Sequence, residues 1–150
     1  MTTGSSHNFL GRILIVDDNS LGLAARRSVL EELGHKVCTC SAPHDALEIC
    51  AQQSFDVVVT DYKMPKMNGL EFIGRLKKLH PQIAVILISG FTDTLGLNES
   101  NTGADIVIQK SSHEVTHLIR SVNRLLRQLQ PAKKPAGSQP PGKSSKRKTR

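Results

Sequence analysis

Short apolar runs alternate with longer amphipathic segments along most of the chain. The runs that predict buried strands lie at residues 12–16, 36–40, 55–60, 83–88 and 105–108. Segments with helical spacing follow the first three runs, at 20–33, 45–53 and 70–79, and the fifth run, at 115–129. This strict alternation predicts an α/β fold, in which a five-stranded parallel, doubly wound sheet carries helices on both faces.

Two helical segments differ in how clearly the sequence defines them. Residues 92–103 contain two glycines, two asparagines and few apolar residues, so we expect the helix there to be short or frayed. The final segment is clear, because its apolar side chains recur at steps of three and four. The side chains predicted to form its buried face are Val115, Leu118, Ile119, Val122, Leu125, Leu126 and Leu129.

The net charge is concentrated in the last twenty residues. The chain of 150 residues contains 20 Lys and Arg against 13 Asp and Glu, a formal charge of +7. Residues 131–150 hold seven of the basic side chains and no acidic one, which leaves 13 of each sign in residues 1–130. We expect this Pro-, Gly-, Ser- and Lys-rich tail to be disordered and residues 1–10 to be flexible. The predicted folded domain is therefore 11–130, with no second folded domain after it.

Composition and hydropathy exclude several classes of protein. The longest apolar run, at 83–88, is far shorter than the about 20 residues of a transmembrane helix. Residues 1–8 are polar and unlike a secretion signal, so we expect a cytoplasmic protein. Cys38, Cys40 and Cys50 lack the spacing of a zinc or disulfide framework, which predicts free thiols that are buried or half-buried. With no Trp, one Tyr and four Phe, a base-stacking surface for single-stranded nucleic acid is not expected.

Charged and hydroxyl side chains follow four of the five predicted strands. Asp17 and Asp18 follow the first strand, and Asp61 follows the third. Ser89 follows the fourth strand and Lys110 the fifth. The carboxyl ends of parallel strands meet at one edge of a sheet, and the first and third strands are neighbours in one common doubly wound order. Three carboxylates gathered there need compensating positive charge, which Mg²⁺ and Lys110 can supply.

Four stretches of the sequence together resemble the receiver domains of response regulators in two-component signalling. They are ILIVDDN at 13–19, DVVVTDYKMPKMNG at 56–69, ILISG at 86–90 and IQK at 108–110. Their order and the spacing of their polar residues also fit the family, and the resemblance covers about residues 11–130. It implies a flavodoxin-like sheet with strand order 2-1-3-4-5 and a receiver of the single-domain type.

The resemblance also implies a reaction and a cofactor. Asp61 is expected to accept a phosphoryl group from a phosphohistidine on a sensor histidine kinase or phosphotransfer protein. Mg²⁺ is expected to be held by Asp17, Asp18, Asp61 and the backbone carbonyl of Lys63, and to neutralise charge during the transfer. The domain would then catalyse only its own phosphorylation and dephosphorylation, and would not act as an enzyme on a metabolite.

The resemblance also implies roles in signalling for two further side chains, and the sequence near them departs from the family pattern. Lys110 would pair with Asp61 at rest and with a phosphoryl oxygen afterwards, while Ser89 would hydrogen-bond another oxygen and report phosphorylation.

The family usually has an aromatic residue where this chain has Val107, and a proline where it has Ser111. These changes leave the phosphorylation chemistry intact. They alter the usual connection to the family's output face, formed by its fourth helix, fifth strand and fifth helix, where an unknown downstream protein would bind.

The sequence supports three alternative functions to different degrees. The main one is a nucleic-acid-associated regulator, in which the tail 131–150 contacts phosphates or another anionic surface. A nucleotide-binding domain is not supported, because no glycine-rich phosphate loop follows the first strand. His113, Glu114 and His117 form an HExxH pattern, typical of zinc peptidases, but no His, Asp or Glu follows His117 to complete the site. We expect that segment to form the first turns of the last helix.

Overall fold

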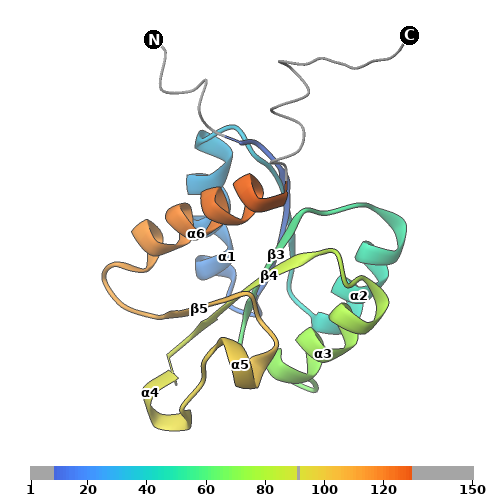
Figure 1. The fold of residues 1–150 in the computed structure, drawn as a ribbon, viewed down its shortest axis with the longest axis vertical. Coiled ribbons are helices and arrows are strands. Elements are labelled where there is room, and N and C mark those ends of the chain that lie inside the picture. Colours follow the sequence, from blue (N-terminus) through green and yellow to red (C-terminus); the bar gives the residue numbers. More distant parts are fainter. Residues whose placement is uncertain (1–8, 91, 130–150) are drawn as a thin grey trace, which may run out of the picture.

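A five-stranded parallel sheet forms the centre of the protein, which a computed structural model describes over residues 9–90 and 92–129 (Figure 1). Its strands are β1 (Arg12–Val16), β2 (Lys36–Cys40), β3 (Val57–Asp61), β4 (Ala84–Ser89) and β5 (Ile106–Gln109). They lie in the order β2-β1-β3-β4-β5, which confirms the predicted fold class and strand order. The predicted basic tail at 131–150 and the first eight residues of the predicted flexible segment at 1–10 lie outside the described residues.

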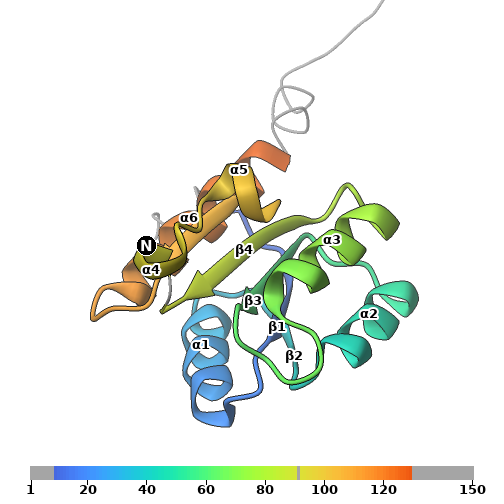
Figure 2. The same cartoon turned by 90° about the horizontal axis from the view of Figure 1, so that it is seen from below.

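Helices cover both faces of this sheet (Figure 1 and Figure 2). One face carries α1 (Ser20–Glu32) and α6 (Glu114–Leu129), and the other carries α2 (Pro43–Gln52) and α3 (Gly69–Leu79). Because successive side chains of a strand point to opposite faces, two apolar cores form. Ile13 packs in the core under α1 and α6 with Leu30 and Leu118, whereas Leu14 packs in the core under α2 and α3 with Phe72.

The last three strands lie slightly further along the chain than predicted. Each begins one or two residues later and ends one residue later, whereas β1 and β2 have the predicted bounds. The cause is the parallel pairing, which continues past the apolar run and places Asp61 opposite Ile88 and Ser89 opposite Gln109. Asp61 and Ser89 are therefore the last residues of their strands, and the sheet itself fixes their backbones.

The segment predicted to form a short or frayed helix folds as two short helices. These are α4 (Thr92–Leu95) and α5 (Glu99–Thr102). Gly96 follows the first with a φ of 66°, and Gly103 follows the second with a φ of 81°. Both values lie in the left-handed region, which glycine adopts readily and which ends a helix. The Asn98 side chain accepts hydrogen bonds from the backbone of the second helix and starts it.

The long final helix is confirmed, but two residues assigned to its buried face are exposed. Val115 is 40% exposed and Leu129 is 43% exposed, while Leu118, Val122 and Leu126 are buried as predicted. The helix has 16 residues and the adjacent strand has four, so the first and last turns extend beyond the sheet. Within the described residues, no helix is both long and apolar enough to cross a membrane.

Three cysteines and one histidine are buried or half-buried in the folded domain. Cys40 and Cys50 are buried and Cys38 is half-buried, and all three are free thiols, as predicted. Burial raises the pKa of the Cys50 thiol to about 11. His35 is also buried, and its Nδ1 accepts a hydrogen bond of 3.2 Å from the Gly11 backbone N–H. None of these four side chains belongs to the aspartate cluster, although Cys40 ends β2 and its carbonyl accepts a hydrogen bond of 3.1 Å from the Asp17 N–H.

Candidate functional site

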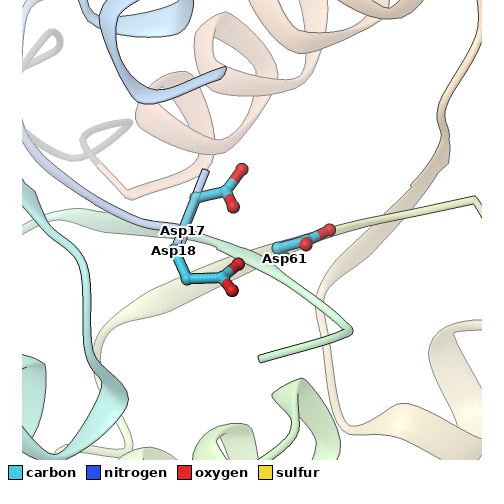
Figure 3. A group of neighbouring side chains, drawn as sticks. All are labelled: Asp17, Asp18 and Asp61. Atoms are coloured by element: carbon cyan, nitrogen blue, oxygen red, sulfur yellow. The ribbon is translucent and has the colours of Figure 1, made fainter. Parts of the chain in front are cut away.

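Three aspartates meet at the carboxyl end of the sheet (Figure 3). Asp17 and Asp18 directly follow β1, and Asp61 ends β3. These two strands are neighbours, with Val16 opposite Thr60. One carboxylate oxygen from each aspartate lies within 4.8 Å of the others. The pairing of β1 with β3 thus brings together acidic side chains that are 44 positions apart in the sequence.

The surroundings of Asp61 disfavour a negative charge on its carboxylate. Its side chain is 7% exposed, and Lys110 Nζ lies 3.0 Å from its Oδ1. Burial raises the pKa of Asp61 above its usual value, and the negative charge of Asp17 adds to this effect. The hydrogen bond from Lys110 lowers the pKa but does not outweigh the other two causes. Lys110 alone therefore does not offset the burial of Asp61, and the oxygen donors of the aspartate cluster fit a hard divalent cation such as Mg²⁺.

The turn after β1 is held by local hydrogen bonds. Asp17 Oδ1 accepts a hydrogen bond of 2.9 Å from the Asn19 N–H. The Asn19 side chain caps α1 by accepting a hydrogen bond of 3.0 Å from the Gly22 N–H. The first helix and the first acidic pair are thus positioned by one short turn, and Asn19 is the residue that connects them.

The loop between β3 and α3 is anchored at both ends and in its middle. The Gly69 N–H donates a hydrogen bond of 2.6 Å to the carbonyl of Tyr62, which closes the loop. The side chains of Met64 and Met67 are buried in the core beneath it. This packing orients the backbone that follows Asp61 and leaves Lys63 on the exposed side.

A cavity of about 580 Å³ lies beside the acidic cluster. Its walls are formed by Asp18, Asn19, Asp61, Lys63, Met64, Pro65, Gly90 and Lys110. Four of the predicted site residues therefore share one solvent-accessible space. The other two, Asp17 and Ser89, are buried next to it, with 1% and 0% of their surface exposed. The Ser89 carbonyl accepts a hydrogen bond of 2.9 Å from the Lys110 N–H, which links the ends of β4 and β5.

Sequence analysis missed one charged residue of this region, Arg26 of α1. Its Nη1 lies 2.6 Å from Asp17 Oδ2, and its Nε lies 2.7 Å from Glu114 Oε2 at the start of α6. Burial opposes the charge of Arg26, but the two carboxylates outweigh this effect and raise its pKa. A signal was present in the sequence, because Arg26 occupies the same helical face as Leu23 and Leu30.

The departures from the family pattern lie on β5 and directly after it. Val107 is half-buried against the core under α2 and α3. No peptide bond in the described part of the chain is cis, so the bond between Lys110 and Ser111 is trans. Neither residue belongs to the aspartate cluster or to the walls of its cavity. The geometry of the acidic site is therefore built without the aromatic residue and the proline that the family usually has.

The HExxH pattern lies at the start of α6, as expected: Glu114 is the first residue of the helix and His113 directly precedes it. The rings of His113 and His117 are exposed and stacked, with their centroids 6.5 Å apart. The carboxylate of Glu114 pairs with Arg26. In residues 9–90 and 92–129, the aspartate cluster is the group of three potential metal ligands that the structure brings together.

Comparisons with known proteins find similar sequences and the same fold in other proteins. Residues 13–123 match the sequence model described as response regulator receiver domain. A CheY-like receiver domain protein from Methanospirillum hungatei is 27% identical, with a TM-score of 0.73 over 82% of this chain and 98% of that one. Response regulator TrrA from Thermotoga maritima, crystallised in complex with Mg²⁺-BeF, is 28% identical. Its TM-score is 0.69, over 76% of this chain and 97% of that one.

Curated relatives resemble this chain over only a part of their own length. A protein-glutamate methylesterase/protein-glutamine glutaminase from Methylobacillus flagellatus is 33% identical over 72% of this chain and 34% of its own. The cyclic di-GMP phosphodiesterase response regulator RpfG from Xanthomonas campestris is 41% identical over 51% of this chain and 21% of its own. The chain thus spans about a third or less of the relatives described here, and the similarity concerns one region of each.

Proposed function

The chain belongs to the response regulator receiver family, and we propose on that basis that it is a phosphorylatable switch with Asp61 as its phosphoacceptor. One observation carries this proposal. Asp61 lies in a cavity with Lys110 3.0 Å from one of its oxygens and with the carboxylates of Asp17 and Asp18 beside it. This arrangement combines a carboxylate nucleophile, a cation and a set of oxygen donors that fit a divalent metal.

The proposed reaction transfers a phosphoryl group from a phosphohistidine to Asp61. The nitrogen–phosphorus bond of the donor breaks while a bond forms between phosphorus and an Asp61 oxygen, and the bonding electron pair returns to the imidazole nitrogen. Lys110 holds Asp61 in place before the reaction and pairs with a phosphoryl oxygen after it. Ser89, which is buried at the end of β4, then hydrogen-bonds another phosphoryl oxygen.

The residues proposed to hold Mg²⁺ are Asp17, Asp18 and Asp61, with the backbone carbonyl of Lys63 as a further ligand. Their donors are all oxygens, and the buried carboxylate of Asp61 lies beside those of Asp17 and Asp18, which supports the binding of a divalent cation there. When bound, Mg²⁺ would neutralise charge on the phosphoryl oxygens during the transfer.

The partners follow from the same reaction. The phosphoryl donor is a sensor histidine kinase or a phosphotransfer protein, and we place the reaction in the cytoplasm. The output is a conformational change that alters binding of a downstream protein, for which the surface over α4, β5 and α6 corresponds to the family's output face. The chain itself catalyses its own phosphorylation and dephosphorylation only.

Intact-mass measurement after incubation with acetyl phosphate and MgCl₂ tests the proposal. The wild-type chain should gain one phosphoryl group, and the variant Asp61→Asn should gain none. Asp45→Asn is a matched control, because Asp45 is an exposed aspartate in the first turn of α2. It should be phosphorylated like the wild type. A phosphoryl group on Asp61→Asn, or none on the wild type, would overturn the assignment.

A further inference from the structure

Arg26 is a buried cation that connects two distant parts of the chain. Its side chain is 6% exposed, whereas the neighbouring Arg27 is 50% exposed and pairs only with Glu31 of its own helix. A buried arginine is costly unless carboxylates compensate it, and here Asp17 and Glu114 do so, at 2.6 and 2.7 Å. Because the guanidinium is planar and rigid, it fixes the position of Asp17 relative to Glu114.

Asp17 is constrained by this arrangement from two sides. Its Oδ1 accepts a hydrogen bond from the Asn19 backbone, and its Oδ2 accepts one from Arg26. The same carboxylate is one of the three that form the acidic cluster. A metal ion held by Asp17 would therefore share it with the guanidinium, and the two positive charges would repel each other.

Glu114, the second carboxylate that pairs with Arg26, is the first residue of α6. Its side chain is 17% exposed, and it is separated from Arg26 by 88 positions in the sequence. Below it, Leu118 packs in the same core as Leu30 of α1, so apolar contacts hold the two helices together further along. The first turn of α6, by contrast, is joined to α1 through a charged pair that responds to nearby charge.

We propose that Arg26 is a positioning residue that couples the charge held at Asp17 to the first turn of α6 through Glu114. The inference rests on the proposed function, because it takes Asp17 as a metal-holding residue. A cation at Asp17 weakens the Arg26–Asp17 pair, Arg26 shifts toward Glu114, and the start of α6 changes its environment. This connection bypasses Val107 and Ser111, where the chain lacks the family's usual residues.

The coupling predicts opposite effects for two substitutions on Mg²⁺ affinity. Arg26→Met removes the competing cation, so Mg²⁺ should bind about tenfold more tightly. Glu114→Gln removes the charge that draws Arg26 away from Asp17, so Mg²⁺ should bind about fivefold more weakly. Glu114→Gln keeps Arg26 and its pair with Asp17 in place, and it decides the proposal even where Arg26→Met does not fold.

The experiment titrates MgCl₂ into the full chain, with affinity measured by calorimetry and backbone amide signals of residues 114–117 followed by NMR. In the wild type these amide signals should shift with Mg²⁺ occupancy, and in Glu114→Gln the shifts should be lost or strongly reduced. Arg27→Met and Glu31→Gln are matched controls on the exposed pair of the same helix, and both should behave like the wild type.

Failure of the inference is distinguishable from failure of the proposed function. A wild-type chain that does not bind Mg²⁺, while Asp61→Asn still accepts a phosphoryl group, contradicts the proposed function. A wild-type chain that binds Mg²⁺ with the same affinity and the same amide shifts as Glu114→Gln overturns the coupling alone. A purely structural ion pair would change stability in the variants without moving Mg²⁺ affinity in opposite directions.

Discussion

Replacing Gly69 by alanine is expected to destabilise the protein, although alanine is normally the better residue in a helix. Gly69 is the first residue of α3, and a Cβ added there would lie 2.5 Å from the Asp61 carbonyl oxygen and 2.9 Å from Tyr62 Cα. It would also lie 3.1 Å from the side chain of the buried Leu87. Two of these neighbours are backbone atoms, so the helix start must move to relieve the contact.

The magnitude follows from two opposing effects. Overpacking of this kind costs about 1–3 kcal/mol, and the gain in helix propensity at a first turn is smaller than the about 1 kcal/mol of a helix interior. We therefore expect a net loss of about 2 kcal/mol in the free energy of unfolding. Gly74, in the same helix, is the matched control, because no atom lies within 4 Å of its added Cβ. Gly74→Ala should stabilise by about 0.5–1 kcal/mol.

Urea unfolding followed by far-UV circular dichroism measures both variants. With a dependence of about 2 kcal/mol per molar urea, the midpoint should fall by about 1 M in Gly69→Ala and rise slightly in Gly74→Ala. Phosphorylation by acetyl phosphate should slow only in Gly69→Ala, because the displaced carbonyl belongs to Asp61. Equal stabilisation of both variants would refute the steric reasoning.

Three further predictions concern buried titratable groups. Burial lowers the pKa of His35, so stability should fall as the pH drops below about 6.5, where the unfolded chain binds a proton and the folded chain does not. His35→Gln should flatten this part of a pH series of urea midpoints. Cys50, with a pKa raised to about 11 by burial, should resist iodoacetamide at pH 8 until the chain is unfolded, as peptide mass analysis would show. Asp61→Asn should raise the melting temperature in EDTA, because burial and the charge of Asp17 disfavour the native carboxylate; an unchanged melting temperature would contradict this.

Much of the fold was predictable because its signals are local. Each strand is a short apolar run with a polar residue at its end, and Asn19 and Gly34 mark the ends of α1 as ordinary helix-terminating residues do. The acidic cluster was predictable for the same reason, since parallel strands end at one edge and place Asp17 near Asp61. The exact strand ends were not, because they depend on pairing with a neighbouring strand.

The pairing of Arg26 with Glu114 shows what sequence reasoning could not predict. An arginine on an apolar helix face is tolerable only with a buried partner, and Glu114 lies 88 positions away. On α6, similarly, periodicity placed Val115 and Leu129 on the buried face, but the length of the sheet decides how much of that face is covered. Both features depend on which distant segments meet, and local patterns do not contain that information.

The pairing of β1 with β3 also determines when the acidic site comes into existence as the protein is made. Val16 lies opposite Thr60, so the residues that flank the cluster come together only after both strands have left the ribosome. No hairpin can bring the two strands together earlier, because parallel neighbours are always joined through a long connection. A nascent chain that ends before Val57 therefore carries Asp17 and Asp18 as ordinary solvated acids. The acidic site is therefore acquired in the same cooperative step as the core, and a variant whose core does not form has no acidic site.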